Sequence, residues 1–460
     1  MILHEPSSFR DPSGFVFNRD GIFYRQINQS YKSNYTQFVQ SGLFKLLVKK
    51  RLLVHHEEIK DNVTKETFRI IKPEQIPFIS YPYEWCFSQL KDAALLTLKI
   101  QKKAIEYGMS LKDCSAYNIQ FYNGSPIFID TLSFEKYSEG HPWVAYRQFC
   151  QHFLAPLSLM AYKDVRLNQL LRIYIDGIPL DMASKILPFK TYFSLSLLTH
   201  IHSHSKSQKY FAGKQTNHKT YKMPHTGVLG IIDNLETIIN KIKWIPPKTE
   251  WDNYYSSMNY AKDSFEHKQR IVSDAINKIQ PKCVWDLGTN RGVFSRIVSE
   301  KGILTISFDM DPACVEKNYL EVRDTKETNI LPLIMDLSNP SPDIGWAHSE
   351  RKSLLNRGPV DTVLALAIIH HLTISNNVPF CKLASFFSKI CLWLIIEFIP
   401  KNDPQIQKLL STREDIFQNY TQAFFEKSFL KYFEFLKILP IKNSERLIYL
   451  MKKKENNKEC

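Results

Sequence analysis

Four residues with a regular spacing in the C-terminal half of the chain could hold a small ligand. The stretch 284–302 reads VWDLGTNRGVFSRIVSEKG and contains Asp286, Gly288, Asn290 and Gly292 at alternate positions. An apolar run precedes these residues and an amphipathic run follows them, which predicts a strand, a turn and a helix. Small residues let the backbone approach a ligand, and the first turn of a helix has N–H groups that can bind it.

Acidic residues end the next two predicted strands. The first of these apolar runs ends at Asp309, about 20 residues after Asp286, where a carboxylate can accept both hydroxyls of a ribose. The second ends at Asp336, which is followed by Leu337. Asp336 could face a ligand at the end of the strand, or it could cap a helix.

Two further apolar runs lead to residues that could act as an acid or a base. The runs 360–366 and 392–400 are largely apolar, which is typical of parallel strands buried on both faces. His370 and His371 follow the first run, and Glu397 lies near the end of the second. One histidine could act as a general base toward a hydroxyl or an amine, oriented by a carboxylate such as Glu397. Alternatively, the first histidine packs against a helix and Glu397 is a structural salt-bridge partner.

This succession of strands, glycines and acids resembles the class I S-adenosyl-L-methionine (SAM) methyltransferases, whose motif I is similar to Asp286–Gly292. The resemblance implies a Rossmann-like α/β domain of seven strands, closed by an antiparallel hairpin near 432–439 and 446–451. It also implies S-adenosyl-L-methionine as the cofactor, with Asp336 facing the adenine amino group and Leu337 packing on the ring. The implied cofactor-binding residues are Asp286, Gly288, Asn290, Gly292, Asp309, Asp336 and Leu337.

Two flanking segments extend the resemblance. The aromatic-rich segment 251–260 resembles the part that closes over SAM in this family, and 397–426 (EFIPKNDPQ…REDIF…YT…FE) resembles a bacterial group of methyltransferases related to nodulation-type proteins. Residues 401–432 predict a long helical insertion before the last hairpin, and such insertions often shape an acceptor site. The signature Asn/Asp-Pro-Pro-Phe/Tyr of amino-methylating enzymes is absent after the fourth strand, which disfavours methylation of a nucleic-acid amine.

A second set of polar residues lies in the N-terminal half. Asp113, Asn118 five positions later, and Asp130 after a predicted hairpin resemble the catalytic loop and metal-binding acid of protein-kinase-like and aminoglycoside-phosphotransferase-like folds. That resemblance implies a base in Asp113 and a magnesium site between Asn118 and Asp130. The chain departs from the pattern, because Leu111-Lys112 precedes Asp113 and no glycine-rich hairpin is present. Asp and Asn at these positions could also simply form turns.

The segment 199–226 is basic, polar and rich in histidine. His200, His202 and His204 alternate, so a strand would place three imidazoles on one face as a conceivable metal site. Neither Cys nor acidic residues accompany them, and the neighbouring lysines would repel a cation. The pattern therefore favours a solvated linker, and we expect no metal ion.

The composition is ordinary for a globular protein. Of 460 residues, 44% are hydrophobic and 23% charged, and no apolar stretch approaches the roughly 20 residues of a membrane span. The 8 cysteines contain no C-x-x-C pair, so we expect a reducing cytoplasm. The net charge of +14 is spread along the chain, which favours a basic surface over a nucleic-acid site.

We therefore expect an α/β protein with an α+β N-terminal domain over 1–198, a basic linker and connecting helix over 199–245, and a methyltransferase domain over 246–460. The expected function is SAM-dependent methyl transfer to a small molecule or a glycan-type metabolite. One alternative is a bifunctional or pseudokinase protein whose N-terminal domain binds nucleotide or a partner. Another is a non-catalytic scaffold that binds SAM or nucleic acid, marked by steeply salt-dependent binding.

Overall fold

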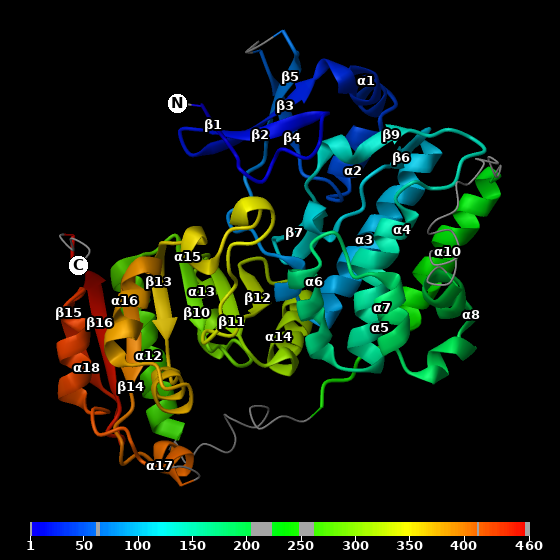
Figure 1. Cartoon of the computed structure of the whole chain (residues 1–460). Helices are drawn as coiled ribbons and strands as arrows, with labels where there is room; N and C mark the ends of the chain where they lie inside the picture. The colour runs from blue at the N-terminus through cyan, green and yellow to red at the C-terminus, as the bar shows by residue number, and fades with distance from the viewer. Residues whose placement is uncertain (1, 61–64, 204–222, 248–261, 412–413, 456–460) are drawn as a thin grey trace. The chain divides into compact units, whose positions relative to one another are not determined.

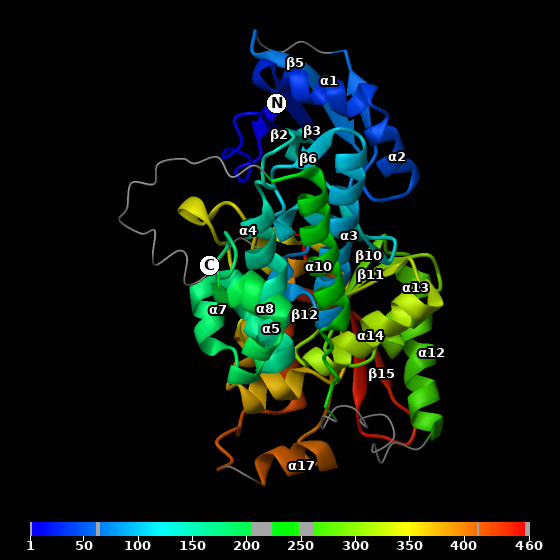
Figure 2. The same ribbon diagram turned by 90° about the vertical axis from the view of Figure 1, so that its right-hand side faces the viewer.

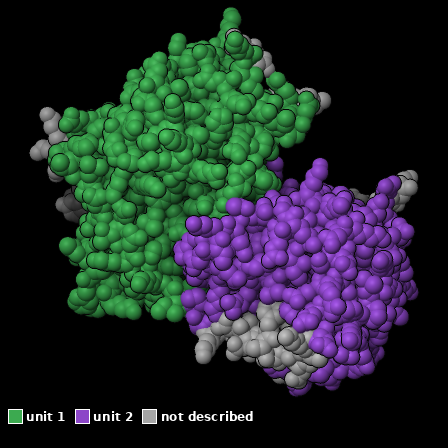
Figure 3. Space-filling view, turned by 180° about the vertical axis from the view of Figure 1, so that it is seen from behind, with its two compact units in different colours: residues 1–245, 344–351 green, residues 246–343, 352–460 purple. Residues whose placement is uncertain are grey.

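A computed structural model describes residues 2–60, 65–203, 223–247, 262–411 and 414–455. The chain forms two compact units, coloured separately in Figure 3. Unit 1 comprises residues 1–245 and 344–351, and unit 2 comprises 246–343 and 352–460. The aromatic segment 251–260 and His204 lie outside the described residues, so their predicted roles stay predictions.

Unit 2 is built on one sheet of seven strands (Figure 1). Its strands are β10 (Cys283–Leu287), β11 (Leu304–Asp309), β12 (Ile330–Ile334), β13 (Val360–Ala365), β14 (Cys391–Phe398), β15 (Phe433–Pro440) and β16 (Leu447–Lys453). Its helices are α12 (Lys262–Ile279), α13 (Val293–Ser299), α14 (Pro312–Thr325), α15 (Leu354–Arg357), α16 (Phe380–Ile390), α17 (Pro404–Leu410) and α18 (Gln422–Phe429).

The order of the strands is β12-β11-β10-β13-β14-β16-β15. The five strands from β12 to β14 run parallel, whereas β16 is antiparallel to both β14 and β15. The predicted parallel strands and the closing antiparallel hairpin are thus confirmed. The chain reverses direction across the sheet between β10 and β13, which is where open α/β sheets bind their ligands.

Side chains that alternate along the strands build a core on each face of this sheet. Ile395 of β14 packs into an apolar cluster with Val272 of α12 and Val298 of α13. Phe398 points to the other face, where its ring contacts Phe380 of α16 and Phe425 of α18. Because apolar side chains cover both faces of the sheet, nearly every position along its central strands is apolar.

The insertion after β14 differs from the prediction. The predicted long helical segment over 401–432 contains, among the described residues, only the short helices α17 and α18, and residues 414–421 before α18 are irregular. Asp403 caps α17 by accepting a hydrogen bond from the Gln405 N–H at 2.9 Å, and Thr421 caps α18. Because Asp403 and Thr421 each cap the start of a helix, the segment forms two separate helices.

Unit 1 begins with a five-stranded antiparallel sheet of order β1-β2-β3-β5-β4. Its strands are β1 (Ile2–His4), β2 (Gly14–Arg19), β3 (Ile22–Asn28), β4 (His56–Ile59) and β5 (Thr67–Pro73). Two further antiparallel pairs follow in unit 1: β6 (Met109–Leu111) with β9 (Phe134–Lys136), and the hairpin of β7 (Ile119–Tyr122) and β8 (Ser125–Phe128). Its helices are α1 (Lys32–Gln40), α2 (Leu43–Lys49), α3 (Phe87–Glu106), α4 (Tyr146–Phe149), α5 (Ala155–Tyr162), α6 (Leu170–Ile173), α7 (Leu180–Ile186), α8 (Leu195–Leu197) and α10 (His225–Lys241).

The described ends of the His-rich segment, residues 199–203 and 223–226, and helix α10 belong to unit 1. His200 is 3% exposed and bonds Tyr146 Oη and Asn234 Oδ1, at 2.6 and 2.9 Å. His202 is 1% exposed and stacks on Tyr192. Helix α10 packs along α3 (Figure 2), where Lys102 of α3 forms ion pairs with two acids of α10. The prediction of a solvated segment is wrong for His200 and His202, because their ring nitrogens find buried partners.

Residues 344–351 are also part of unit 1, although they lie between β12 and β13 in sequence. Arg10 binds Glu350 through two hydrogen bonds of 2.9 and 2.6 Å, and Glu350 is 4% exposed. The guanidinium of Arg351 lies 4.2 Å from the centre of the Tyr117 ring. A paired, buried carboxylate and a cation–π contact together fix this segment.

Candidate active site

The glycine turn after β10 is required by its backbone geometry. Gly288 and Gly292 have φ values of 76° and 78°, and Asn290 between them has a φ of 53°. A Cβ atom on Gly288 would lie 2.8 Å from Ile368 Cδ1, and one on Gly292 would lie 2.7 Å from Asn318 Nδ2. Glycine, and next asparagine, adopt this left-handed region at the lowest cost. The sequence pattern therefore reflects a tightly turned loop at the carboxyl end of β10.

Asp286 lies below this loop and organises a buried network. Its carboxylate is 2% exposed and accepts a hydrogen bond of 2.7 Å from Ser295 Oγ. Ser295 Oγ also forms a hydrogen bond of 3.0 Å with Ser307 Oγ, and Ser307 donates to Thr289 Oγ1 at 3.0 Å. Burial raises the pKa of Asp286 to about 7, against the effect of the Ser295 hydrogen bond. Asp286 therefore ties the loop to α13 and β11.

Asp309 stands at the carboxyl end of β11, beside the same loop. Its carboxylate accepts backbone N–H bonds from Asn290 at 2.7 Å and from Asp311 at 2.9 Å. Desolvation raises its pKa to about 6, and these N–H groups oppose the rise. Asp311 instead caps α14, accepting from the Ala313 N–H at 2.8 Å. Asp309 is thus the acid that faces the turn, half-buried and ionised at neutral pH.

Asp336 and Leu337 directly follow the neighbouring strand β12, and both are half-buried. Asp336 Oδ1 accepts hydrogen bonds from Ser338 N–H at 2.8 Å and from Ser338 Oγ at 2.6 Å. Since β11 and β12 are parallel neighbours, Asp309 and Asp336 end adjacent strands at one edge of the sheet. Asp336 therefore forms a local turn. It also lies at the carboxyl ends of the parallel strands, where open α/β sheets bind their ligands.

His370 and His371 follow β13 with their ring centres 4.1 Å apart. His370 is 3% exposed, and its Nδ1 finds no hydrogen-bond partner among the described residues. Burial, helped by the charges of His371, Arg446 and Lys268, holds the pKa of His370 well below its usual range. Burial lowers the pKa of the more exposed His371 to about 4. Burial thus favours the neutral form of both imidazoles.

Glu397 lies in a buried network of ion pairs. Its carboxylate is 0% exposed, 2.6 Å from Lys268 Nζ of α12 and 3.6 Å from Arg446 Nη1. Arg446 also binds Asp403 through two hydrogen bonds of 2.7 and 3.1 Å. Since His370 Nδ1 has no partner in the described part of the chain, Glu397 does not orient that nitrogen. This geometry matches the salt-bridge interpretation of Glu397.

Sequence reasoning missed Lys268 and Arg446. Both are more than nine-tenths buried, yet each is one of 60 basic residues in a chain whose charge is spread evenly. Burial lowers the pKa of Lys268, while the charge and hydrogen bond of Glu397 raise it. The sequence does contain one indication that Lys268 is buried: it occupies a position on the apolar face of the amphipathic helix α12.

The groups at the carboxyl ends of β10, β11 and β12 fit SAM. A ribose needs hydroxyl acceptors, and a carboxylate has about four lone-pair sites, so Asp309 can accept hydroxyls besides its backbone N–H groups. SAM also carries a positively charged sulfonium, which suits an edge where Asp309 and Asp336 are acidic. The left-handed φ of Gly288 lets the loop turn tightly at the end of β10. No three His, Cys, Asp or Glu side chains gather as a metal site among the described residues.

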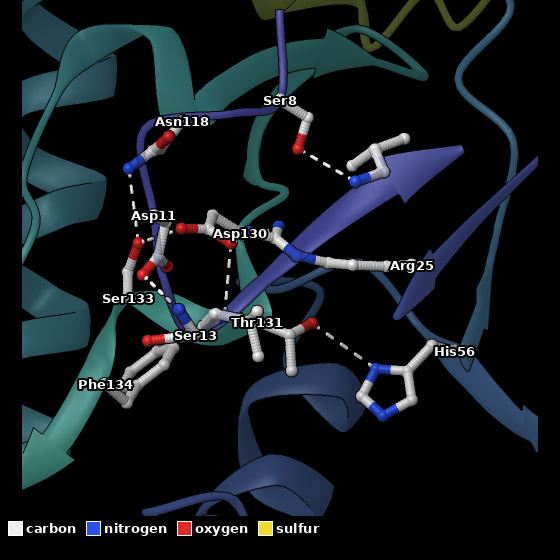
Figure 4. A network of polar contacts seen from close by, with 12 residues as sticks. Ser8, Asp11, Ser13, Arg25, His56, Asn118, Asp130, Thr131, Ser133 and Phe134 are labelled. Carbon is white, nitrogen blue, oxygen red and sulfur yellow. Dashed lines mark hydrogen bonds and ion pairs between the residues drawn. The ribbon is translucent and has the colours of Figure 1, made fainter. Parts of the chain in front are cut away.

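The N-terminal candidates form a separate polar network (Figure 4). Asn118 donates to Ser133 Oγ at 3.2 Å, and Ser133 in turn donates to Asp130. Arg25 of β3 forms an ion pair with the same carboxylate. Asp113 accepts instead from Ser115 N–H and Gln148 Nε2, at 2.9 and 2.8 Å. Ser133 thus links Asn118 to Asp130. The guanidinium of Arg25 supplies the positive charge that neutralises the Asp130 carboxylate.

The strand order and the glycine turn together define unit 2 as a class I SAM-dependent methyltransferase fold. Over its full length the chain is 30% identical to nodulation protein NoeA of Rhizobium meliloti (strain 1021), in an alignment of 458 residues that covers 97% of this chain and 96% of the relative. The chain belongs to the family of that protein. No family model matches it. The kinase-like fold of unit 1 stays a prediction.

Solved structures show weaker likeness. The chain is similar to magnesium protoporphyrin IX methyltransferase from Synechocystis PCC 6803 with bound SAH, at 16% identity and a TM-score of 0.32, over 44% of this chain and 93% of that one. It is also similar to the bifunctional kinase-methyltransferase WbdD, at 13% identity and a TM-score of 0.29, over 47% of this chain and 45% of that one. We base the family assignment on the full-length relative alone.

Proposed function

We propose that the chain is a SAM-dependent methyltransferase whose acceptor is a small molecule or a glycan-type metabolite. The observation that carries the proposal is the left-handed glycine turn at the end of β10, with the half-buried carboxylate of Asp309 hydrogen-bonded across it. Asp309 would accept the ribose hydroxyls, Asp336 and Leu337 would flank the adenine, and Gly288 would allow the tight turn that presents Asn290 to Asp309. Asp286 holds the loop in place from below.

SAM would supply an electrophilic methyl group, and the chain would bring an acceptor atom in line with it. The acceptor would arrive at the carboxyl ends of β13 and β14, where His370 and His371 lie. Of the two, His371 is the better candidate for a general base because it is half-buried, whereas His370 is 3% exposed. A base with a pKa of about 4 is neutral at pH 7 and accepts a proton only as the acceptor forms its new bond.

Isothermal titration of the full chain with SAM tests this proposal. We expect the wild type to bind with a micromolar Kd, and Asp309→Ala to weaken binding by about 10- to 100-fold, since a hydrogen bond to a charged group contributes about 1.5–3 kcal/mol. Gly288→Val should abolish binding because its side chain would clash with Ile368 and its φ would be strained.

The matched control is Asp324→Ala, an exposed acid on α14, which should leave the Kd unchanged. The melting temperature of each variant shows whether it is folded. A wild type that unfolds cooperatively but gives no heat with SAM would contradict the proposal. The same conclusion would follow if Asp309→Ala bound as tightly as the control.

A further inference from the structure

A polar cavity of about 280 Å³ opens beyond the carboxyl end of β14. Its lining includes Ser264, Pro400, Asn402, Asp403, Asn443 and Arg446, all within unit 2. The volume is close to the lower end, about 300 Å³, of the range for small-molecule sites. The cavity therefore has room for a single ring-sized group.

The fold places this cavity at the ligand edge of the sheet. β14 ends at Phe398, which pairs with Leu447, the first residue of the antiparallel strand β16. The turn that carries Asn443 and Arg446 precedes β16, so it lies at the edge where the parallel strands end. The cavity thus shares an edge with the loop at Gly288 and with His370.

One lining group has no hydrogen-bond partner among the residues that the structure describes. This group is the Oγ of Ser264, a residue that is 1% exposed. A buried hydroxyl without a partner costs about 1–3 kcal/mol, so proteins rarely leave one unsatisfied. A hydroxyl that is buried, unpaired and part of a cavity wall is placed to bond a ligand.

The charges around the cavity restrict that ligand. Arg446 is engaged by Asp403 and Glu397. Asp403 and Glu445 supply two negative charges to the lining, and Glu445 accepts a hydrogen bond from Asn402. A phosphate or carboxylate would meet this acidic wall at a cost. Amide, hydroxyl and carboxylate oxygens instead suit the hydroxyls of a neutral ligand.

Arg446, which lines the cavity, also belongs to the charged surroundings of His370, the residue before the candidate base His371. Arg446 and Lys268, which binds Glu397, both lower the pKa of His370. Two basic side chains therefore lie within range of the imidazole.

We propose that this cavity binds the methyl acceptor, and that the bound part is a neutral, hydroxyl-bearing group of the size of one sugar ring. This inference rests on the proposed methyltransferase function. Ser264 and Asn402 would bond the hydroxyls, while Arg446 holds Asp403 in place as a positioning residue.

Saturation-transfer NMR of the full chain with methyl α-D-glucopyranoside, in the presence of SAH, tests this assignment. We expect a signal from the wild type in the millimolar range and a signal at least fivefold weaker for glucose 6-phosphate. Ser264→Ala should weaken the glucoside signal at least fivefold without lowering the melting temperature. Asn402→Leu should weaken it similarly, whereas Asn419→Leu, an exposed turn residue outside the cavity, should not.

SAM titration of the same samples separates the two proposals. If SAM binds but the glucoside gives no signal, or if Ser264→Ala and Asn402→Leu leave that signal unchanged, the cavity assignment is wrong and the methyltransferase proposal stands. A stronger signal for glucose 6-phosphate than for the glucoside would also overturn it. If SAM fails to bind, the proposed function fails first.

Discussion

At the scale of single residues, Asp286 and Asp309 illustrate how neighbouring acids take different tasks. Asp286 lies near the end of β10 and Asp309 ends β11, yet Asp286 is 2% exposed and bonded to Ser295, whereas Asp309 is half-buried beside the loop. Burial raises both pKa values, to about 7 and about 6. The more deeply buried acid therefore serves the structure, and the more accessible one is available to a ligand.

The raised pKa of Asp286 predicts a pH-dependent stability. Because the folded state favours the protonated form, this contribution is complete below the unfolded pKa of about 4 and is lost as the pH rises to about 7. Asp286→Asn cannot ionise, so its melting temperature relative to the wild type should rise between pH 4 and pH 8. Calorimetry across this range measures the difference.

The exposed residue Asp274 on α12 provides the control for that comparison. Asp274→Asn should differ from the wild type by a constant amount at every pH. If the Asp286→Asn difference is equally constant, Asp286 is ionised in the folded protein throughout.

At the scale of elements, strand β14 and helix α12 share more than apolar contacts. The alternation that turns Ile395 toward α12 turns Glu397 the same way, where Lys268 meets it at 2.6 Å. Desolvation of two charges offsets much of their attraction, so the pair contributes little as long as it is intact. Loss of one partner, however, leaves a buried charge alone.

We therefore expect Glu397→Gln to lower the free energy of unfolding by about 3–5 kcal/mol. The double variant Lys268→Met with Glu397→Gln should recover more than half of that loss, because Arg446 keeps its bonds to Asp403. Urea unfolding followed by circular dichroism measures both. Glu106→Gln, in an exposed pair with Lys103, should change stability by less than about 1 kcal/mol. Purely additive losses in the double variant would refute this account of the pair.

At the scale of the whole molecule, the two units present different kinds of acidic site. In unit 2 Asp309 and Asp336 are half-buried and accept hydrogen bonds from neighbouring backbone N–H groups, whereas in unit 1 the ion pair with Arg25 neutralises Asp130. Ser133 and the Leu132 N–H, at 3.1 Å, also bond that carboxylate. No helix in the described residues is long and apolar enough to cross a membrane.

We accordingly expect Mg-ATP to leave the melting temperature of the full chain unchanged within about 1 °C. Ligand at 100 times its Kd would stabilise a binding unit by about 2.7 kcal/mol, which is a shift of several degrees. Thermal shift with Mg-ATP, alongside SAM as the positive comparison, measures this directly. A shift that Asp130→Asn removes would instead support the bifunctional alternative.

The sequence by itself determined most of unit 2. The seven strands, the turn at Gly288 and Gly292, and the acids at Asp309 and Asp336 could all be predicted, because each signal lies within one short segment. Apolar runs, left-handed turn residues and strand-end acids depend on neighbours a few positions away.

Only the tertiary structure decided which polar residues meet. Lys268 and Glu397 are 129 positions apart and Arg10 and Glu350 are 340 apart, so no local pattern indicates either pair. His200 and His202 look solvated in sequence but are buried, because Tyr146, Asn234 and other distant groups satisfy their nitrogens. Whether a polar side chain is buried depends on partners that folding brings together. Local sequence patterns therefore predict the helices and strands well, but they do not predict which polar side chains are buried or which partners they meet.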